Sequence, residues 1–270
     1  MRPEAAFQRA CTLDVAVRKP GNVSRASPGH GMQAGQFIAA ARVASAPLFA
    51  RGSSVGERIE RAMAASLAAA GCNTNLGIVL LAAPIAAASE RAGALDGPTA
   101  LRHALDDVLA TLDLDDARAA FRAIAAARPG GLGRAGAQDV HDEPSVDLRA
   151  AMALAAARDS IARQYANGFA DLFETGLALV KGEPDAAAVQ RVYLGFLAAW
   201  PDSHIVRKHG EAVAQSVMRV AQGFVTKGGP GREDVLAEWD ESLKVQAINP
   251  GTSADLTVAT LLLALLWHGS

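Results

Sequence analysis

Helical periodicity runs through this sequence from one end to the other, and it constrains the fold more than any other feature. Apolar residues recur every three or four positions, and no stretch alternates β-branched with polar residues as a half-buried strand does. Half of the 270 residues are hydrophobic but only 5% are aromatic, so small and aliphatic side chains supply the apolar mass. Such side chains let helices approach closely. The sequence therefore predicts the all-α class, with many helices packed in a bundle.

Two segments are apolar around nearly their whole circumference, residues 76–91 and 253–267. A surface helix needs only one apolar face, so we expect both segments to be buried helices. The apolar part of the second, residues 256–267, is shorter than the ~20 residues that cross a bilayer, which argues against a membrane partner. Ser54 and Glu57 have the spacing of a capping box and predict the start of a helix that ends near residue 70.

The same periodicity predicts helices at residues 4–17, 33–49, 98–112, 115–127, 145–167, 168–180, 185–200, 209–226 and 232–243. Residues 128–136 are rich in glycine and lack periodicity, so they are expected to form a surface loop. No linker is long or polar enough to divide the chain. We therefore expect a single domain over residues 1–270, in which the polar loops converge on a cleft.

Charge and cysteine content exclude several classes of protein. The formal net charge is -2 and the isoelectric point about 6.3, so no basic field favours nucleic acid as a partner. Cys11 and Cys72 have neither zinc-site spacing nor the number needed for a disulfide framework, which favours a reducing compartment. The first twenty residues carry several charges and do not resemble a secretion leader, so we expect a cytoplasmic protein. The sequence does not determine whether the protein forms a homo-oligomer.

Polar residues gather at four breaks between the predicted helices. The first break places Lys19, Asn22 and Arg25 around a Pro-Gly turn, with His30 a few residues further on. Cations and backbone amides at such a turn can bind a polyphosphate. From these residues alone, a solvated loop with incidental charge is the simpler interpretation.

Two other breaks come directly before the two buried helices. Asn73 and Asn75 precede residues 76–91, and because one asparagine suffices for capping, the second favours a bound ligand. Asn249, Ser253 and Asp255 mark the start of the last helix. Asp255 could ligate Mg²⁺ or polarise a hydroxyl group, while Ser253 and Asp255 could equally be helix caps.

The remaining break is the most densely polar. Within a few residues it contains Asp202, Ser203, His204, Arg207 and Lys208. An imidazole can act as an acid or base near neutral pH, although a lone histidine is more often structural. The combination of an acid, a hydroxyl group, an imidazole and two cations is uncommon in a solvated loop and favours a site.

Two further candidates lie outside these breaks. Asp159 and Arg163 are four residues apart, and the alanines around them favour a buried pair, although such pairs usually lie on the surface. Asp139 belongs to an acidic segment beside the glycine-rich loop and is a lesser candidate for a metal ligand.

Taken in order, the four breaks resemble the triphosphoribosyl-dephospho-CoA synthase family, over nearly the whole chain. The resemblance implies an all-helical fold, ATP and dephospho-CoA as substrates, and transfer of the triphosphoribosyl unit of ATP to the 2′-hydroxyl of dephospho-CoA with release of adenine. It rests on Lys19-Pro20-Gly21-Asn22-Val23, Asn73-Thr74-Asn75-Leu76-Gly77, Pro201-Asp202-Ser203-His204-Ile205 and Asn249-Pro250-Gly251-Thr252-Ser253-Ala254-Asp255-Leu256.

The motifs differ from those of the best-known branch of that family. That branch has an acid after the first motif, an Asp-Met-Asp group after its histidine, and His-Lys where this chain has Asn75 and Leu76. The Lys-Pro-Gly-Asn-Val and Asn-Thr-Asn-Leu-Gly versions look like a divergent branch of archaea and one-carbon-metabolising bacteria. The resemblance therefore leaves two alternatives open, a related transferase that makes a one-carbon coenzyme from another acceptor, or a nucleotide-binding protein without turnover.

The chemistry that the resemblance implies is substitution at the anomeric carbon of the ATP ribose, through an oxocarbenium-like transition state. It needs cations on the triphosphate, including a suspected Mg²⁺, a carboxylate near the reacting atoms, and a proton donor for adenine. The candidates are Asp202, His204, His30 and Asp255 for catalysis, Asp202, Asp255 and Asp139 for metal, and Lys19, Asn22, Arg25, Asn73, Asn75, Ser203, Arg207, Lys208, Asn249, Ser253, Asp159 and Arg163 for nucleotide binding.

Overall fold

The computed structural model describes residues 1–92, 97–229 and 231–268, and within these ranges it contains helices and isolated bridges but no strand. The predicted all-α class is confirmed. The helices are α1 (Pro3–Ala16), α2 (Ala34–Leu48), α3 (Val55–Ala70), α4 (Leu76–Ala92), α5 (Pro98–Ala110), α6 (Leu114–Ala127), α7 (Leu148–Ala155), α8 (Ser160–Asn167), a π-helical turn (Asp171–Gly176), a 3-10 turn (Leu177–Leu179), α9 (Ala186–Ala199), α10 (Ser203–His209), α11 (Glu211–Thr226), α12 (Glu233–Val245) and α13 (Gly251–His268).

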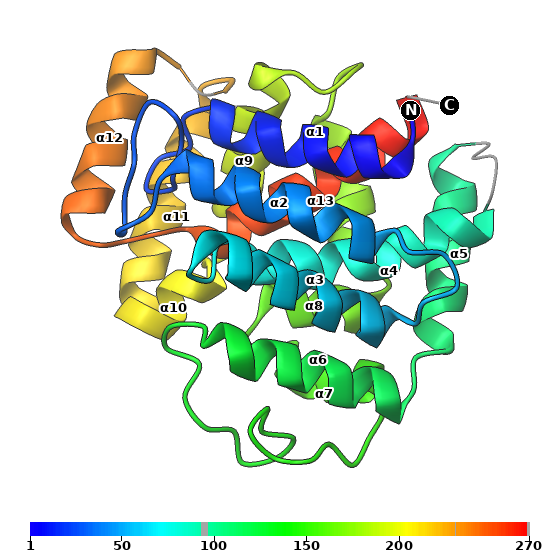
Figure 1. Cartoon of the computed structure of the whole chain (residues 1–270). Coiled ribbons are helices and arrows are strands. Elements are labelled where there is room, and N and C mark those ends of the chain that lie inside the picture. The colour runs from blue at the N-terminus through cyan, green and yellow to red at the C-terminus, as the bar shows by residue number, and fades with distance from the viewer. Residues whose placement is uncertain (93–96, 230, 269–270) are drawn as a thin grey trace.

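Helices α4 and α13 form the centre of the bundle, and the other helices pack around them (Figure 1). Helix α13 contacts α1, α4 and α9, whereas α4 also contacts α3 and α5. Leu256 through Leu266 are almost completely buried in α13, as are Leu76 through Ala86 in α4. The prediction that these two segments are buried helices is confirmed, because only a helix at the centre can bury residues on every side.

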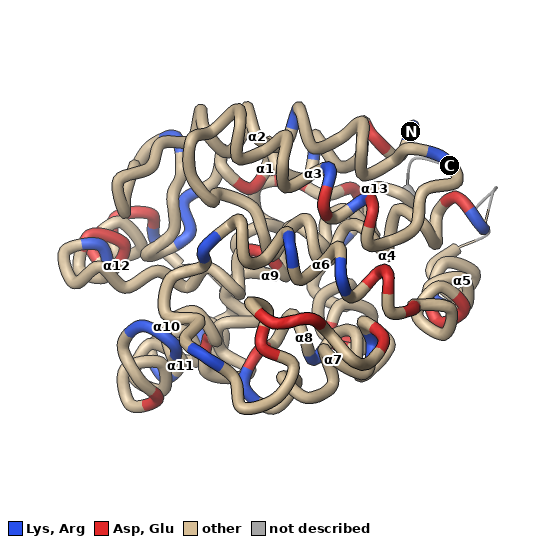
Figure 2. Tube along the Cα trace, turned by 60° about the horizontal axis from the view of Figure 1, so that its bottom comes forward, with Lys and Arg blue, Asp and Glu red and all other residues tan. Residues whose placement is uncertain are grey.

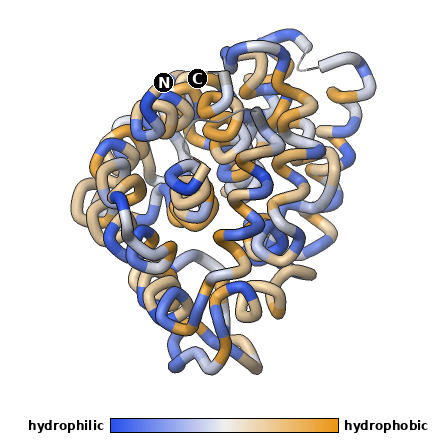
Figure 3. The backbone as a smooth tube through the Cα atoms, turned by 90° about the vertical axis from the view of Figure 1, so that its right-hand side faces the viewer, coloured by the Kyte–Doolittle hydropathy of each residue, from blue (hydrophilic) through white to orange (hydrophobic). Residues whose placement is uncertain are grey.

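Polar and apolar residues alternate around most of the outer helices (Figure 3). In the view of Figure 2, lysine and arginine positions lie among acidic positions along most of the described chain. The capping box is present, since Ser54 accepts a hydrogen bond from the amide of Glu57 and the Glu57 carboxylate accepts one from the amide of Ser54. No helix in the described part of the chain has the length and apolar character needed to cross a bilayer.

Three predicted elements are wrong in detail. The single helix at residues 145–167 is divided into α7 and α8, because the side chain of Asp159 accepts hydrogen bonds from the amides of Ile161 and Ala162 and starts a new helix. The predicted helix at 168–180 consists of the π-helical and 3-10 turns. The densely polar break that contains Asp202 and Lys208 is not a loop. It contains α10, for which Asp202 is the N-cap.

Candidate functional site

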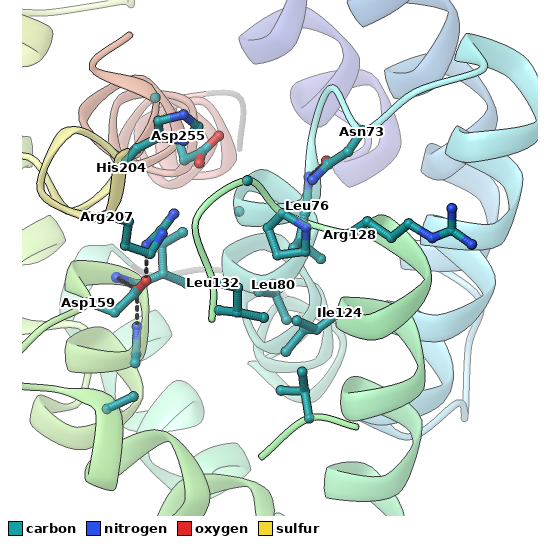
Figure 4. A pocket seen from close by; sticks show the side chains of 18 of the residues that line it. Asn73, Leu76, Leu80, Ile124, Arg128, Leu132, Asp159, His204, Arg207 and Asp255 are labelled. Carbon is teal, nitrogen blue, oxygen red and sulfur yellow. Dashed lines mark hydrogen bonds and ion pairs between the residues drawn. The ribbon is translucent and has the colours of Figure 1, made fainter. Parts of the chain in front are cut away.

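A pocket of about 750 Å³ opens where α1, α4, α10 and α13 meet the glycine-rich loop of residues 128–138 and the chain around α7 and α8 (Figure 4). It collects residues from all four polar breaks. Its polar lining includes Asp14, Asn22, His30, Asn73, Thr74, Asn75, Asp139, Asp159, His204, Arg207, Lys208, Asn249 and Asp255. Six predicted binding or catalytic residues do not line it: Lys19, Arg25, Arg163, Asp202, Ser203 and Ser253.

Asp255 projects into the pocket from the first turn of α13, and its carboxylate accepts no hydrogen bond from the described residues. Burial raises the pKa of Asp255 well above its usual value, and the neighbouring carboxylates of Asp14 and Asp202 raise it further. The carboxylate lies against the first turn of α4, where a Cβ on Gly77 would be 2.1 Å from Oδ2 of Asp255. Glycine is therefore required at position 77, because any side chain there would overlap the carboxylate of Asp255.

Lys19 does not reach the pocket, because its side chain is completely buried behind it. Its Nζ donates to Oδ2 of Asp14 at 3.0 Å and to Oδ1 of Asn22 at 2.7 Å. Asn22 in turn donates from Nδ2 to Oδ1 of Asn249 at 2.9 Å. The expected phosphate ligand is instead an internal cation that orients three pocket residues from α1, the first break and the fourth break.

Asp14 was missed by the sequence analysis and is part of the pocket lining. Its Oδ2 accepts from Lys19, while its Oδ1 is buried without a hydrogen-bond partner. Burial raises the pKa of Asp14, opposed by the ammonium group of Lys19. The available signal was a carboxylate on the face of α1 that also buries Phe7 and Cys11, where an unpaired charge is costly.

Asp202 is fully engaged inside the protein. Its Oδ1 caps α10 by accepting from the amides of His204 and Ile205, and its Oδ2 accepts from both the amide and the hydroxyl group of Ser253. Burial raises the pKa of Asp202, and the hydrogen bonds from Ser253 oppose that rise. With both oxygens occupied and 1% of its surface exposed, Asp202 joins α10 to α13 and is not positioned as a metal ligand.

The same interior position accounts for the two predicted serines. Ser203 accepts a hydrogen bond from the amide of Ser160 and donates to its hydroxyl oxygen, which joins α10 to α8. Ser253 is bonded to Asp202. Ser203 and Ser253 were expected to bind the nucleotide, and in this structure both hydroxyl groups are buried and bonded to other parts of the protein.

Helix α10 supplies His204, Arg207 and Lys208 to the pocket. Burial, together with the positive charges of Arg207 and Lys208, lowers the pKa of His204 to about 3. Nε2 of His204 is buried without a partner. Arg207 donates from Nη1 to Oδ2 of Asp159 at 2.5 Å and leaves Nε unpaired, and Lys208 has no ion-pair partner among the described residues.

The predicted pair of Asp159 and Arg163 does not form. Because Asp159 is the N-cap of α8 and not part of its regular turns, its carboxylate turns toward Arg207. Arg163 instead donates to Asp171 at 2.8 Å and lies over the ring of Trp200. Arg25 is exposed outside the pocket lining, and only its backbone amide is engaged, with the carbonyl of Val15.

The two asparagines of the second break have different roles. Asn73 caps α4, since its Oδ1 accepts from the amide of Leu76 at 3.1 Å. Asn75 donates to Ser66 and leaves its own Oδ1 buried and unpaired in the pocket wall. His30, whose Nε2 lies 2.7 Å from the carbonyl oxygen of Gly21, completes the lining on the side of the first break. Burial lowers the pKa of His30.

Asp139 closes the glycine-rich loop. Its Oδ2 accepts from the amide of Ala135 at 2.6 Å and its Oδ1 from the amide of His141 at 2.9 Å. These hydrogen bonds lower the pKa of Asp139. The residue was expected as a metal ligand, and the structure uses it to shape the loop. Across the described residues, no group of three or more His, Cys, Asp and Glu side chains is arranged to hold a metal ion.

The chain matches, over residues 1–270, a family model described as ATP:dephospho-CoA triphosphoribosyl transferase. A crystal structure of an Archaeoglobus fulgidus protein, provisionally named a triphosphoribosyl-dephospho-CoA synthase, is similar with a TM-score of 0.68 and 25% sequence identity. That similarity covers 86% of this chain and 98% of the other. No curated protein matches the chain.

Proposed function

This chain belongs to the ATP:dephospho-CoA triphosphoribosyl transferase family, and on that premise we propose that the pocket described above is the site of transfer. The family expected from the four polar motifs is confirmed. The chain is a pentosyltransferase that moves the triphosphoribosyl unit of ATP to dephospho-CoA and releases adenine. The residues that perform the transfer are proposed from their contacts.

The observation that carries the proposal is the combination of cations and an unpaired carboxylate at one end of the pocket. Arg207 and Lys208 of α10 provide positive charge for a triphosphate, and Asp255 of α13 provides a carboxylate without a partner. Figure 4 shows His204, Arg207 and Asp255 at the same end. A transition state that develops positive charge at the anomeric carbon, beside a polyanion, requires both kinds of group.

The transfer breaks the bond between C1′ of the ATP ribose and N9 of adenine and forms a bond between C1′ and the 2′-oxygen of dephospho-CoA. The hydroxyl group loses a proton to the protein, and the leaving adenine takes up a proton from water, so the number of protons is balanced. We assign Asp255 to accept the hydroxyl proton, because a carboxylate with a raised pKa is a better base near neutral pH than an ordinary aspartate. Asp14 adds negative charge near the developing cation.

His204 is neutral in the free enzyme, because its pKa of about 3 lies far below physiological pH. It therefore has no surplus proton to give to adenine. Its unpaired Nε2 is instead suited to a hydrogen bond with the bound nucleotide. The unpaired Oδ1 of Asn75 is suited to a donor on the edge of a base or to a hydroxyl group of a ribose.

The residues present fit a Mg²⁺ ion that arrives with the triphosphate better than one held by the protein alone. Mg²⁺ usually binds one or two carboxylates together with substrate phosphates. Asp255, with Oδ1 of Asp14, offers such a set, since both acids line the pocket and no described residue donates a hydrogen bond to these oxygens. When bound, the ion would neutralise charge on the triphosphate.

We also propose a cytoplasmic place of action, without nucleic acid or a membrane as partner. The support is that both substrates are nucleotides and that residues of both charge signs are interspersed along the chain (Figure 2). A fractionation of cells that recovered the chain with membranes or with nucleic acid would contradict this proposal.

The deciding experiment is incubation of the protein with Mg·ATP, with and without dephospho-CoA, followed by mass spectrometry of adenine and of the product. Adenine release that depends on dephospho-CoA, with a product heavier by one triphosphoribosyl unit, is expected. Adenine release only with another acceptor would favour the related one-carbon coenzyme transferase, and ATP binding without adenine release would favour a binding protein.

Arg207→Ala tests whether the triphosphate of ATP binds at the end of the pocket formed by α10. Losing charge-assisted hydrogen bonds worth about 1.5–3 kcal/mol should raise the KM for ATP roughly 10- to 150-fold. Arg219→Ala is the matched control, because Arg219 is exposed on α11 outside the pocket lining. An unchanged KM for ATP in the Arg207 variant would show that the triphosphate lies elsewhere.

A further inference from the structure

The pocket has two ends of different character (Figure 4). The end at α10 and α13 holds Asp255, His204 and Arg207, which the proposed transfer uses. A second part of the pocket begins at the turn of α4 that lies against Asp255 and continues between α4, α6, α7 and the glycine-rich loop, and Figure 4 shows Leu76, Leu80 and Ile124 there. We call this part of the pocket the apolar end. The proposed chemistry at C1′ leaves it without a function.

The apolar end is built from aliphatic side chains on several elements. Leu76 and Leu80 come from α4, Ile124 from α6 and Met152 from α7, and each is less than a tenth exposed although it lines the pocket. Leu132 of the glycine-rich loop extends toward them and is 37% exposed. A wall of flexible and branched aliphatic groups suits a ligand that is itself a chain of methylene and methyl groups.

Arg128 lines this end of the pocket, as does Arg134, which lies within 4 Å of the carboxylates of Asp139 and Asp142. Arg128 is the C-cap of α6 and adopts a left-handed backbone conformation with φ of 46°. Figure 4 shows Arg128 on the side of the pocket away from Arg207, with its guanidinium group extending outward from the end of α6. Its side chain is exposed and forms no hydrogen bond or ion pair with the described residues. A free guanidinium at the rim of an apolar wall is suited to a ligand with both a phosphate group and an aliphatic chain.

Resting on the proposed function, we propose that the apolar end binds the pantetheine arm of dephospho-CoA and that Arg128 binds its diphosphate. The arm carries a dimethyl-substituted carbon, methylene groups and two amides, so it matches aliphatic walls along its length. The acceptor would then enter from the Arg128 side and present its ribose to Asp255. ATP would occupy the end with Arg207 and Lys208.

The adenine ring of ATP is the competing occupant of the apolar end. A purine is usually held by an aromatic face together with polar groups at its edges. Both polar atoms of the Asn22 amide are bonded, to Lys19 and to Asn249, so this amide is not free for such edges. The described walls of the apolar end are mainly aliphatic, which favours the pantetheine arm.

The test compares dephospho-CoA with ADP, which has the same adenosine diphosphate but lacks the pantetheine arm. Calorimetry with saturating inorganic tripolyphosphate, which fills the Arg207 and Lys208 end, measures the binding of each and does not depend on turnover. We expect dephospho-CoA to bind the wild-type protein at least tenfold more tightly than ADP. Leu132→Asp should abolish most of that difference while leaving the affinity for ADP within about twofold. Equal affinities in the wild-type protein would overturn the proposal.

Two further variants separate binding of the diphosphate from binding of the pantetheine arm. Arg128→Met should weaken dephospho-CoA and ADP by the same factor, because both carry the diphosphate, and should leave the KM for ATP unchanged. Ile124→Ala repeats the test of the apolar wall with a smaller change than Leu132→Asp. Val220→Asp is the control, since Val220 is exposed on α11 outside the pocket lining.

A rise in the KM for ATP in the Leu132 or Ile124 variants, without a change for dephospho-CoA, would place the adenine of ATP at the apolar end and overturn the proposal. Failure of the proposed function is distinct from this outcome. It would appear as absence of adenine release in the wild-type protein, while the calorimetric comparison would still report whether the pantetheine arm is bound.

Discussion

Asp255 is held in surroundings that disfavour its own charge. Burial and the carboxylates of Asp14 and Asp202 raise its pKa, and the described residues donate no hydrogen bond to it. An acid whose folded pKa is raised destabilises the fold as pH increases from its unfolded pKa toward its folded pKa. This cost is tolerated because a charge with no partner in the protein remains available for a substrate or ion.

Asp255→Asn is therefore expected to abolish adenine release and to raise the midpoint of thermal unfolding. The substitution keeps the size of the side chain and removes the unfavourable charge. The gain in midpoint should be small near pH 4, where Asp255 binds its proton in the folded state, and larger at pH 8. Thermal melts of both proteins across this range, with assays of adenine release, make the measurement. Full activity in the variant would reduce Asp255 to a structural residue.

Lys19 illustrates the opposite case, a predicted ligand that is a buried internal cation. Lys19→Met would leave Asp14 without its partner in the interior, and breaking a buried pair in this way costs about 3–5 kcal/mol. We expect denaturant unfolding to show a loss of that size. The double variant Lys19→Met with Asp14→Asn should recover part of the loss, because it removes the stranded charge as well. A single variant as stable as the wild-type protein would mean that the pair contributes little.

At the scale of elements, the site depends on how closely α4 approaches α13. Gly77 makes that approach possible, since an added Cβ would lie 2.1 Å from Oδ2 of Asp255 and 2.6 Å from Cδ1 of Ile161. Helix α4, which begins directly after Asn75, and helix α13, which carries Asp255, thus meet at the pocket wall. Neither contact is visible in the periodicity of either helix.

Gly77→Ala should lower stability by about 1–3 kcal/mol through overpacking and should reduce turnover by displacing Asp255. Gly223→Ala is the matched control, because Gly223 lies within α11 with no atom within 4 Å of an added Cβ. That control should gain about 0.5–1 kcal/mol from better helix propensity. Urea unfolding of the two variants gives the comparison, and equal effects of both would contradict the proposed close approach.

For the whole molecule, the pocket takes residues from α1 near one end of the sequence and from α13 near the other. The buried residues form a large cluster, against which Trp200 packs, and a smaller one, against which Trp239 packs. Helix α13 contributes to both clusters through Leu256 and Ala254. We therefore propose that residues 1–270 fold as one cooperative unit, as the absence of a linker predicts.

This proposal predicts coincident unfolding of the two clusters. With Trp267 replaced by phenylalanine, Trp239→Phe leaves Trp200 as the reporter of the larger cluster, and Trp200→Phe leaves Trp239 as the reporter of the smaller one. Fluorescence midpoints in urea should agree with each other and with circular dichroism once each is compared with its own variant. Midpoints that differ between fluorescence and circular dichroism within one variant would indicate two units.

The sequence by itself determined the all-α class, the burial of α4 and α13, the capping box at Ser54 and the family, because periodicity, caps and ordered motifs are local properties. It did not determine which polar residues face the pocket. Asp202 and Asp255 stand in similar breaks, yet the first is bonded on both oxygens and the second on neither. Likewise, Lys19 is buried in the interior, whereas its partner Asp14 lines the pocket. Such differences arise when distant helices pack, because only then does each donor meet its acceptor, and the acceptors left unpaired become the site.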